Sequence, residues 1–553
     1  MFDDSTLETF LDGTMPRFEE QLVEVIEIPS ISQQPGTYGK DCRRVAEVVA
    51  EYTRDLGFTT DVLETEGLPA VIGKLEVDPS LPWVVIYNHL DVQPANEELQ
   101  DGSSAWRTEP FVAARVGDAV VGRGATDDKG PLLTTLHAIK YLQETGQLNV
   151  NVQVVYETEE EAGSPNFRSF LQENRDHLVE PAAIVVSDTI FEGDNPALTY
   201  TLRGVVKAEI SLEYTAATQN PSARAITCEA KLEVGTDVVH SGLGGGFVAN
   251  PNNVLASALR NATSHKDLCV LGYDGGLQGT KIPPWARANL LLELQGRDRA
   301  TALRALQDQL QETHPSIQVC STEAPLNELT EALASCRDPQ TGDVLVPHFY
   351  DGVQEPSAAQ LAGIEPIATA ATVDRYLKDM GVHREGTYTL DPAQMLTNIW
   401  FKPTFDVHNI RRDGTKATAE VSMRLVPGQD PTDLLAHLAT HLQEQYEGIV
   451  VTPGPGANAV FTAPVDSPYM LAAASACEYG FGLPAVFVGC GGTIGALSPM
   501  QESFPGVDMV MLAQSKMSDG YHKANEQFEL PHARMGIKAM ARCLYNMGEV
   551  AKR

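Results

Sequence analysis

Val120-Val-Gly-Arg-Gly-Ala-Thr-Asp-Asp-Lys-Gly-Pro-Leu-Leu133 is the stretch from which the fold can be read. A strand-like apolar run ends in two glycines and two adjacent carboxylates, Asp127 and Asp128, and an apolar segment of helical period follows Gly130. The pattern predicts a strand-to-helix turn, and in open α/β sheets such turns line the crevice in which ligands bind. Either aspartate could instead cap the helix, since Asp is a favoured cap.

Acidic and imidazole side chains also follow three other predicted strands. Continuous apolar runs, typical of buried strands, close on His89 and Asp91, on Glu159 to Glu161, and on Asp188. His522 lies in a late polar loop. Carboxylates gathered at one end of a sheet would repel one another unless a cation lay between them. The arrangement therefore predicts a metal site.

Composition limits the class of protein. A chain of 553 residues can bury two cores, and 43% hydrophobic with 21% charged residues is typical of soluble globular proteins. The net charge of -34 argues against nucleic acid or an anionic membrane as a partner. Eight scattered cysteines without a Cys-x-x-Cys pair support neither a zinc ribbon nor a disulfide scaffold. With no signal-like start and no run long enough to span a bilayer, we expect a cytoplasmic protein.

The order of predicted elements indicates two domains. Residues 1–204 alternate strands and helices, which predicts an α/β domain with a mixed sheet flanked by helices. Residues 205–454 have an α+β pattern, and residues 455–553 return to α/β, so the second domain is inserted into the first. Within the insertion, the strand, turn, helix and strand of residues 286–320 match those of residues 417–452, which indicates an internal repeat that enlarges this domain.

Five motifs occur in an order that resembles the dinuclear-zinc M20 peptidase family, with the carnosinase-like dipeptidases as the most similar branch. They are His89-Leu-Asp91, Gly124-Ala-Thr-Asp-Asp-Lys-Gly130, Glu160-Glu-Ala-Gly-Ser164, Ser187-Asp188 and His522-Lys-Ala-Asn-Glu526. Any one motif is weak, but five in the family's order are specific. The resemblance covers most of the chain except about Ala258 to Pro325. It implies a catalytic α/β domain of the zinc-peptidase type, with the insertion as a lid and dimerisation domain.

The resemblance also implies a set of metal ligands. Asp127 would bridge two ions, with His89 and Asp188 completing one site and Glu161 and His522 the other. Imidazole and carboxylate suit Zn²⁺, although Mn²⁺ or Co²⁺ can occupy the same ligands. Two residues after His89 on a strand, Asp91 would point to the same face and accept the other imidazole N–H.

Two further residues are expected to act in catalysis. Glu160 is the predicted general base, because alternation at a strand end would turn it away from its neighbour Glu161 and toward the reacting water. Glu159 is the rival, and the family pattern selects Glu160. His240, in a His-Ser-Gly motif, matches the family's oxyanion donor, often supplied by the partner subunit of a dimer; the alternative is an ordinary turn histidine.

Substrate binding is assigned by the same resemblance. Arg424 matches the family's carboxylate-binding arginine, and Gly491, Gly492 and Thr493 match the loop that also holds this carboxylate; an ordinary surface arginine is the alternative for Arg424. His408 is a weaker candidate. The family's acidic residue before the two glycines is Cys490 here, and its Ile-Pro is Ile494-Gly495. These departures leave recognition of the substrate's amino end open.

The sequence therefore predicts a hydrolase with two divalent metal ions that cleaves the amide bond of dipeptides or short peptides with a free carboxy terminus. An N-acyl-amino-acid amidohydrolase of the same family and a catalytically silent binding protein are the alternatives. We expect a homodimer through the inserted domain. A monomer made self-sufficient by the enlarged insertion is the other arrangement, and it would place His240 in its own active site.

Overall fold

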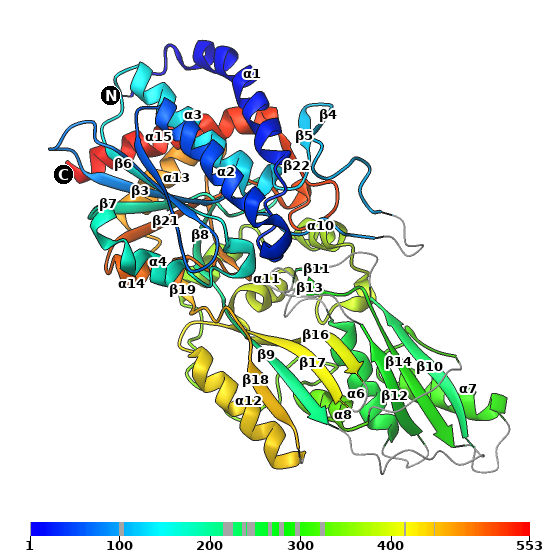
Figure 1. Ribbon diagram of the computed structural model, residues 1–553. Coiled ribbons are helices and arrows are strands. Elements are labelled where there is room, and N and C mark those ends of the chain that lie inside the picture. The colour runs from blue at the N-terminus through cyan, green and yellow to red at the C-terminus, as the bar shows by residue number, and fades with distance from the viewer. Residues whose placement is uncertain are drawn as a thin grey trace. The chain divides into compact units, whose positions relative to one another are not determined.

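The chain divides into two compact units, which Figure 1 shows in a computed structural model. The first unit comprises Met1–Thr201, Thr462–Gly489 and Ile494–Arg553, and the second comprises Leu202–Phe461 and Cys490–Thr493. The structure describes residues 2–98, 104–213, 225–234, 239–240, 249–263, 268–275, 281–293, 299–320, 327–413, 416–446 and 448–552.

A mixed sheet forms the centre of the first unit. Its described strands follow the order β1-β2-β6-β3-β7-β21-β8-β19, and β20 also pairs with β8. Neighbours among β6, β3, β7 and β21 are parallel, whereas β1, β2 and β8 pair antiparallel. The strands are β1 Thr59–Leu63, β2 Ala70–Leu75, β3 Trp83–His89, β6 Asn151–Glu157, β7 Pro181–Val186, β8 Ala197–Leu202, β19 Phe461–Thr462, β20 Val486–Cys490 and β21 Asp508–Leu512.

Helices cover both faces of this sheet, which explains why its parallel strands are apolar throughout. Val84 and Ile86 of β3 join one core cluster with α1 Leu7–Ile26, α2 Pro35–Asp55, α3 Gly130–Glu144, α13 Pro468–Phe481 and α15 Leu530–Ala551. Tyr87 points to the opposite face, where its ring lies 5.7 Å from Phe167 of α4 Phe167–Glu173. The helix α14 Leu497–Ser503 packs against α4. Successive residues of one strand thus alternate between two cores.

The strand that leads to Asp127 belongs to a second, smaller sheet. β5 Ala119–Val121 pairs with β4 Ala114–Val116 and with β22 Gln527–Glu529. The expectation that the strand before Asp127 is equivalent to those before His89 and Asp188 was therefore wrong. The turn Ala125–Lys129 and helix α3 do follow the strand directly, as the Gly-rich pattern predicts.

The described residues of the second unit form two antiparallel four-stranded sheets and one short strand pair. One has the order β16-β17-β9-β18 and the other β12-β14-β10-β15. The first is built from β9 Gly204–Glu213, β16 Thr404–Asp413, β17 Lys416–Leu425 and β18 Val450–Pro453, and the second from β10 Ala225–Glu233, β12 Leu268–Asp274, β14 Trp285–Glu293 and β15 Ile317–Cys320. A short pair joins β11 Val239–His240 to β13 Lys281–Ile282.

Both sheets of the second unit place their strands in the same order relative to the chain. In each, the first strand in sequence lies between the third and the fourth, and the second lies at an edge. A helix joins the third strand to the fourth in each case, α7 Arg299–Gln311 and α12 Pro431–Gln445. The other α-helices in the described part of this unit are α6 Pro251–Thr263, α8 Asn327–Ser335, α9 Ala358–Ile364, α10 Ala370–Met380 and α11 Pro392–Phe401. The sequence repeat itself stays a prediction.

Candidate metal centre

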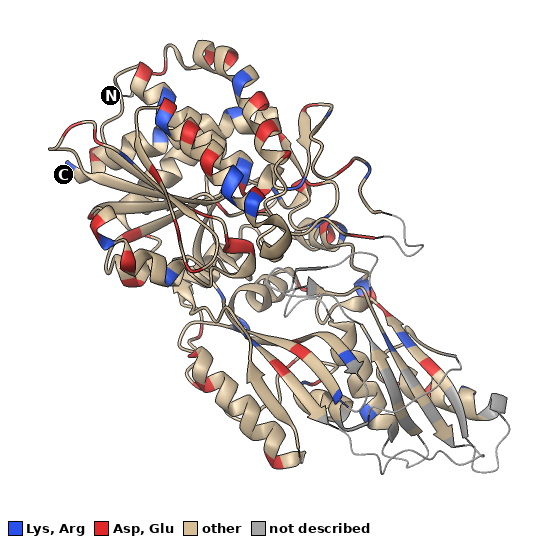
Figure 2. Cartoon of the chain, viewed as in Figure 1, with Lys and Arg blue, Asp and Glu red and all other residues tan. Residues whose placement is uncertain are grey.

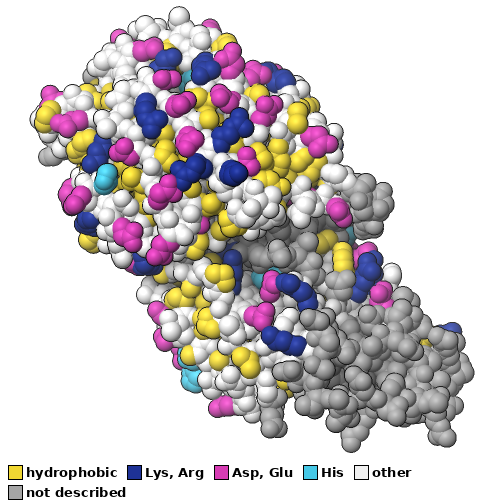
Figure 3. Space-filling model, viewed as in Figure 1, with side chains coloured by type: hydrophobic (Ala, Val, Ile, Leu, Met, Phe, Trp, Pro, Cys, Tyr) yellow, Lys and Arg dark blue, Asp and Glu magenta, His cyan; other side chains and the backbone are white. Residues whose placement is uncertain are grey.

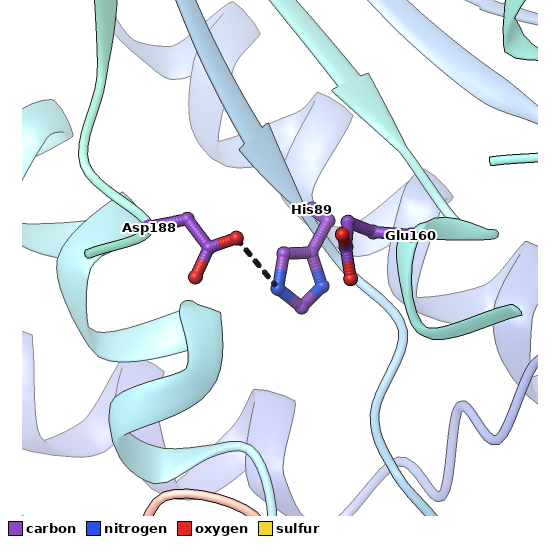
Figure 4. Close-up of side chains that lie close together, drawn as sticks. All are labelled: His89, Glu160 and Asp188. Atoms are coloured by element: carbon purple, nitrogen blue, oxygen red, sulfur yellow. Dashed lines mark ion pairs between the residues drawn. The ribbon is translucent and has the colours of Figure 1, made fainter. Parts of the chain in front are cut away.

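Three neighbouring parallel strands deliver polar side chains to one edge of the central sheet. β3 lies between β6 and β7, and the carboxyl ends of these strands lead to His89, to Glu160 and Glu161, and to Asp188. Figure 4 shows the His89 ring between the carboxylates of Glu160 and Asp188. The Nε2 atom of His89 lies 3.8 Å from Oδ2 of Asp188. Residues far apart in sequence thus meet where open α/β sheets bind ligands.

Asp127 lies between the two histidines that were predicted to bind different ions. Its Oδ1 lies 3.0 Å from Nε2 of His89, and its Oδ2 lies 2.8 Å from Nε2 of His522. Oε2 of Glu161 lies 3.2 Å from the same His522 nitrogen. One carboxylate therefore presents a separate oxygen to each side of the centre, which is the geometry that a bridging ligand needs.

The potential ligand atoms fall into two groups of three, and within each group they lie within 4.8 Å of one another. His89, Glu160 and Asp188 form the first group, and Asp127, Glu161 and His522 form the second. The grouping contains all five predicted ligands and adds Glu160, the predicted base, to the first group. Nitrogen and oxygen donors of this kind fit Zn²⁺ and similar divalent ions.

The electrostatics of the centre also suit a bound cation. Burial and the charge of Asp127 raise the pKa of the Asp188 carboxyl to about 6. Burial would lower the pKa of His522, but the charge of Glu161 and hydrogen bonds to Asp127 and Glu161 raise it to about 10. Without another positive charge, His522 would hold its proton at neutral pH and Asp188 would release its proton less readily than an ordinary aspartate. A divalent cation would supply that charge instead.

Asp91 connects the first histidine to the loop that carries the two glutamates. Nδ1 of His89 lies 3.1 Å from the main-chain carbonyl of Asp91 and 3.4 Å from its Oδ1, so the nearer acceptor is the backbone and not the carboxylate that we expected. The carboxylate instead accepts the backbone N–H groups of Glu160 at 3.1 Å and Glu161 at 2.9 Å.

The reason given for the orientation of Glu160 was wrong. β6 ends at Glu157, and Glu160–Ala162 form one 3₁₀ turn, so strand alternation does not apply to Glu160 and Glu161. The backbone N–H of Gly495 donates to Oε1 of Glu160 at 3.2 Å. Burial raises the pKa of the Glu160 carboxyl well above its usual value. The rival Glu159 accepts hydrogen bonds from the Asn166 amide at 2.9 and 3.1 Å and belongs to neither ligand group.

Several contacts of the centre were not predicted from the sequence. Gln93 donates from Nε2 to Oε2 of Glu161 at 2.6 Å, and Tyr521 donates from its hydroxyl to Oδ1 of Asp188. Glu526 accepts the backbone N–H groups of Thr126 and Asp127. Gln93 follows Asp91 at the same two-residue spacing that separates Asp91 from His89, so the spacing could have indicated it, although β3 itself ends at His89. The other two partnerships join residues more than 300 positions apart, and no local pattern reports them.

The predicted carboxylate-binding residues lie together in the second unit. Nη1 of Arg424 donates to Oγ1 of Thr493 at 2.8 Å, and Nε of Arg203 donates to the carbonyl of Gly491 at 3.2 Å. The Gly492 N–H donates to Sγ of Cys490 at 3.3 Å. Arg424 is 1% exposed, so it is not a surface arginine. Burial lowers the pKa of the Arg424 guanidinium to about 10.

The other two candidate histidines are placed differently. His408 is buried in β16, where Nε2 lies 2.6 Å from Oγ of Ser422 on the neighbouring strand. The backbone of His240 pairs with Lys281 between β11 and β13. The His240 side chain lies outside the described residues, so its predicted role as an oxyanion donor stays a prediction.

Comparison with known proteins identifies the family. The model of Peptidase family M20/M25/M40 matches residues 85–546, and the chain belongs to this family. The predicted family is therefore confirmed, and with it the assignment of the chain as a peptidase-family enzyme. Among curated proteins, Cys-Gly metallodipeptidase dug1 of Schizosaccharomyces pombe is 24% identical over 98% of both chains. Beta-Ala-His dipeptidase of Rattus norvegicus is 24% identical over 96% of this chain and 93% of its own.

Solved structures share the fold over nearly the whole length. Human carnosine dipeptidase 1 superposes with a TM-score of 0.68 at 21% identity, covering 98% of this chain and 99% of its own. The dipeptidase Dug1p of Saccharomyces cerevisiae gives a TM-score of 0.70 at 20% identity, covering 99% and 98%. The predicted fold class, an α/β catalytic domain with an inserted α+β lid domain, is confirmed. No helix in the described part of the chain combines the length and apolar character needed to cross a bilayer.

Proposed function

We propose that this protein is a dinuclear metal-dependent hydrolase that cleaves the amide bond of dipeptides or short peptides with a free carboxy terminus. The observation that carries the proposal is the position of Asp127, with one carboxylate oxygen 3.0 Å from His89 and the other 2.8 Å from His522. The dipeptidase names of the full-length relatives support the substrate class. Those names do not favour the N-acyl-amino-acid alternative.

The proposed ions would be held by residues of the first unit alone. His89 and Asp188 would bind one ion, Glu161 and His522 the other, and Asp127 both; Zn²⁺ is the proposed metal, with Mn²⁺ or Co²⁺ as alternatives. Such ions, when bound, lower the pKa of water and polarise a carbonyl group. The imidazole of His89 is oriented for this role by Asp91, through the contact at Nδ1.

Glu160 would move the proton. Its carboxylate, held at Oε1 by the Gly495 N–H, would accept a proton from the attacking water and pass it to the leaving amine. On the family resemblance, His240 would donate to the oxyanion. Arg424, with Gly491, Gly492 and Thr493, would bind the free carboxylate of the substrate, for which a guanidinium is well suited.

A substrate panel tests the activity. Chelated protein is reconstituted separately with Zn²⁺, Mn²⁺ or Co²⁺ and offered free dipeptides, the same dipeptides with an amidated carboxy terminus, and N-acyl amino acids. We expect hydrolysis of the free dipeptides and loss of hydrolysis on amidation. Turnover of N-acyl amino acids alone would show the amidohydrolase, and a metal-loaded protein without activity on the panel would show a silent binding protein.

A pair of neighbouring variants tests the base. Glu160→Gln should retain both ions and lower kcat by roughly 10²- to 10⁴-fold. Glu159→Gln is the matched control and should retain activity, because Glu159 is directed to Asn166. If Glu159→Gln were the inactive variant, the assignment would be reversed.

We further propose a cytoplasmic homodimer joined through the second unit. The eight cysteines are scattered along the sequence and form no Cys-x-x-Cys pair, which supports a reducing compartment. A mixing experiment tests the dimer: His240→Ala and Glu160→Gln subunits are each inactive, and random exchange should restore about a quarter of the activity if His240 serves the partner subunit. A self-sufficient monomer would show no recovery.

A further inference from the structure

Tyr521 touches one residue from each group of potential ligands. Its hydroxyl donates to Oδ1 of Asp188, which belongs to the first group. Its ring stacks on the ring of His522 in the second group, with centroids 5.1 Å apart and an interplanar angle of 29°. A single side chain therefore contacts both halves of the centre.

The hydroxyl of Tyr521 fixes the orientation of Asp188. This aspartate follows the end of β7 and lies outside any strand or helix, so regular backbone pairing does not fix its side chain. With Oδ1 held by Tyr521, the other oxygen, Oδ2, faces Nε2 of His89 at 3.8 Å. Tilting the carboxylate out of this position would break the hydrogen bond, whereas a half-turn only exchanges two equivalent oxygens. The hydroxyl thus favours the plane of the carboxylate in which one oxygen faces the ligand nitrogen.

The ring of Tyr521 acts on the second group. His522 lies in an irregular segment with a φ of +56°, a backbone conformation that restricts a residue with a side chain. Its Nε2 faces Oδ2 of Asp127 at 2.8 Å and Oε2 of Glu161 at 3.2 Å. Turning the imidazole away from these oxygens would also break its stacking on Tyr521. The aromatic contact therefore opposes that rotation.

We propose that Tyr521 is a positioning residue that couples the two metal sites, its hydroxyl orienting the ligand Asp188 and its ring orienting the ligand His522. This inference rests on the proposed function, because it takes the two groups of side chains as metal ligands. It assigns separable parts of one side chain to separate ions. Removal of the hydroxyl alone should weaken one ion, and removal of the ring should weaken both.

Metal titration of two variants tests the assignment. Tyr521→Phe removes the hydroxyl and keeps the ring, whereas Tyr521→Leu removes both. Metal-free protein is titrated with Zn²⁺ against a chromophoric chelator, and Co²⁺ absorption spectra report the ligand geometry of each ion. We expect Tyr521→Phe to weaken one of the two ions by roughly 10- to 100-fold and to leave the other unchanged, and Tyr521→Leu to weaken both.

Tyr479→Phe is the matched control. Tyr479 also donates to an aspartate, Oδ2 of Asp4 at 2.8 Å, and Asp4 belongs to neither ligand group. This variant should bind both ions as the unmodified protein does. Unchanged affinities in Tyr521→Phe, or equal weakening of both ions, would overturn the inference. If the unmodified protein binds two ions and cleaves dipeptides, that result leaves the proposed function intact; if it does not bind two ions, the proposed function itself fails.

Discussion

Glu526 holds the turn that presents Asp127. Its Oε1 accepts the backbone N–H groups of Thr126 at 2.9 Å and Asp127 at 3.1 Å, and its Oε2 accepts the N–H of Gly124 at 3.1 Å and Nη1 of Arg123 at 2.9 Å. Four donors thus converge on one buried carboxylate. A carboxylate offers acceptors only, whereas an amide at this position would aim its own N–H groups at donors.

We therefore predict that Glu526→Gln lowers the free energy of unfolding of the metal-free protein by about 2–4 kcal/mol, because buried donors lose their acceptor and the Arg123 charge loses one of its two carboxylate partners, Glu97 being the other. Binding of both ions should weaken as well, since Asp127 would bind both. Denaturant unfolding and metal titration measure the two effects. Glu529→Gln is the control: this carboxylate is 42% exposed and pairs with Lys516 at 3.0 Å, so we expect a change of about 1 kcal/mol or less. Equal effects of the two variants would contradict the prediction.

Gly495 approaches the loop of Glu160 more closely than any other residue type would allow. A Cβ atom at this position would lie 2.6 Å from Oγ of Ser164 and 2.9 Å from the carbonyl of Gly163. Its N–H is also the donor to Glu160. A side chain must therefore displace either the donor or the loop that carries the base.

Gly495→Ala should accordingly reduce kcat by roughly 10- to 100-fold, because a displacement near 1 Å is enough to misalign a catalytic group. Metal affinity should change less than kcat, because the hydrogen bond from Gly495 goes to Glu160, although the predicted ligand Glu161 lies in the same turn. Steady-state kinetics on a metal-saturated enzyme provide the measurement. Gly13→Ala, where an added Cβ meets nothing within 4 Å, should retain full kcat. A Gly495→Ala enzyme with unaltered kcat would show that the Gly495 hydrogen bond does not position Glu160.

At the level of elements, the sequence predicted buried strands well and the connections between them less well. The apolar runs before His89 and Asp188 and before Glu159 are recognisable because strands buried on both faces carry few polar residues. The same reasoning failed for β5, a short strand of a separate sheet, and for Glu160–Ala162, which form a 3₁₀ turn. Partners distant in sequence hold both segments: Glu526 accepts the backbone N–H of Asp127 in the turn after β5, and Asp91 accepts that of Glu161 in the 3₁₀ turn.

The contact between α1 and α3 contains a buried histidine. Nδ1 of His137 lies 2.7 Å from Oγ1 of Thr14, and Nε2 lies 2.9 Å from Oε1 of Gln21. Burial lowers the pKa of this imidazole from 6.5 to about 4. Between these two pH values, the unfolded chain binds a proton that the folded protein excludes. This histidine therefore lowers stability progressively as the pH falls from about 6.5 to about 4, and has no such effect above that range.

We predict that His137→Gln removes this pH dependence. At pH 7 the variant should have a lower free energy of unfolding than the unmodified protein, because its packing is altered. On acidification this difference in free energy should shrink by at most about 1.4 kcal/mol for each pH unit. Denaturant unfolding of metal-free protein at intervals from pH 7.5 to pH 4 measures the difference between the two proteins. Curves that run parallel over this range would contradict the low pKa of His137.

At the level of the whole molecule, the fold class followed from the order of elements, whereas strand order did not. Alternating strands and helices predict a layered α/β unit, and an α+β stretch between two such segments predicts an insertion. That β10 lies between β14 and β15, as β9 lies between β17 and β18, depends on long-range pairing that no local pattern encodes. The same holds for the substrate, because the residues of a site, and not its fold, decide specificity.

The net charge is the other property of the whole molecule. The chain has 74 acidic and 40 basic residues, and Figure 2 shows acidic positions on helices of both units. On the visible face of the first unit, Figure 3 shows basic side chains interspersed among acidic ones. Some of these form exposed pairs, such as Arg534 with Glu8 at 3.0 Å. Salt would weaken such pairs, each worth about 0–1 kcal/mol, and would also screen the repulsion among the excess carboxylates.

We expect the repulsion to dominate, because acidic residues exceed basic ones by 34, so that nearly half of the 74 carboxylates have no basic residue available to them. Raising NaCl from about 0.05 M to about 1 M, which shortens the Debye length to about 3 Å, should increase Tm by several degrees in metal-saturated protein. The same NaCl titration near pH 5, close to the sequence pI of about 4.7, separates charge screening from general salt effects. Protonation of carboxylates removes much of the repulsion at this pH, so the salt-induced increase in Tm should be smaller there. A Tm that falls with salt at neutral pH would mean that the surface ion pairs govern stability instead. An equal rise in Tm at both pH values would mean that non-electrostatic salt effects do.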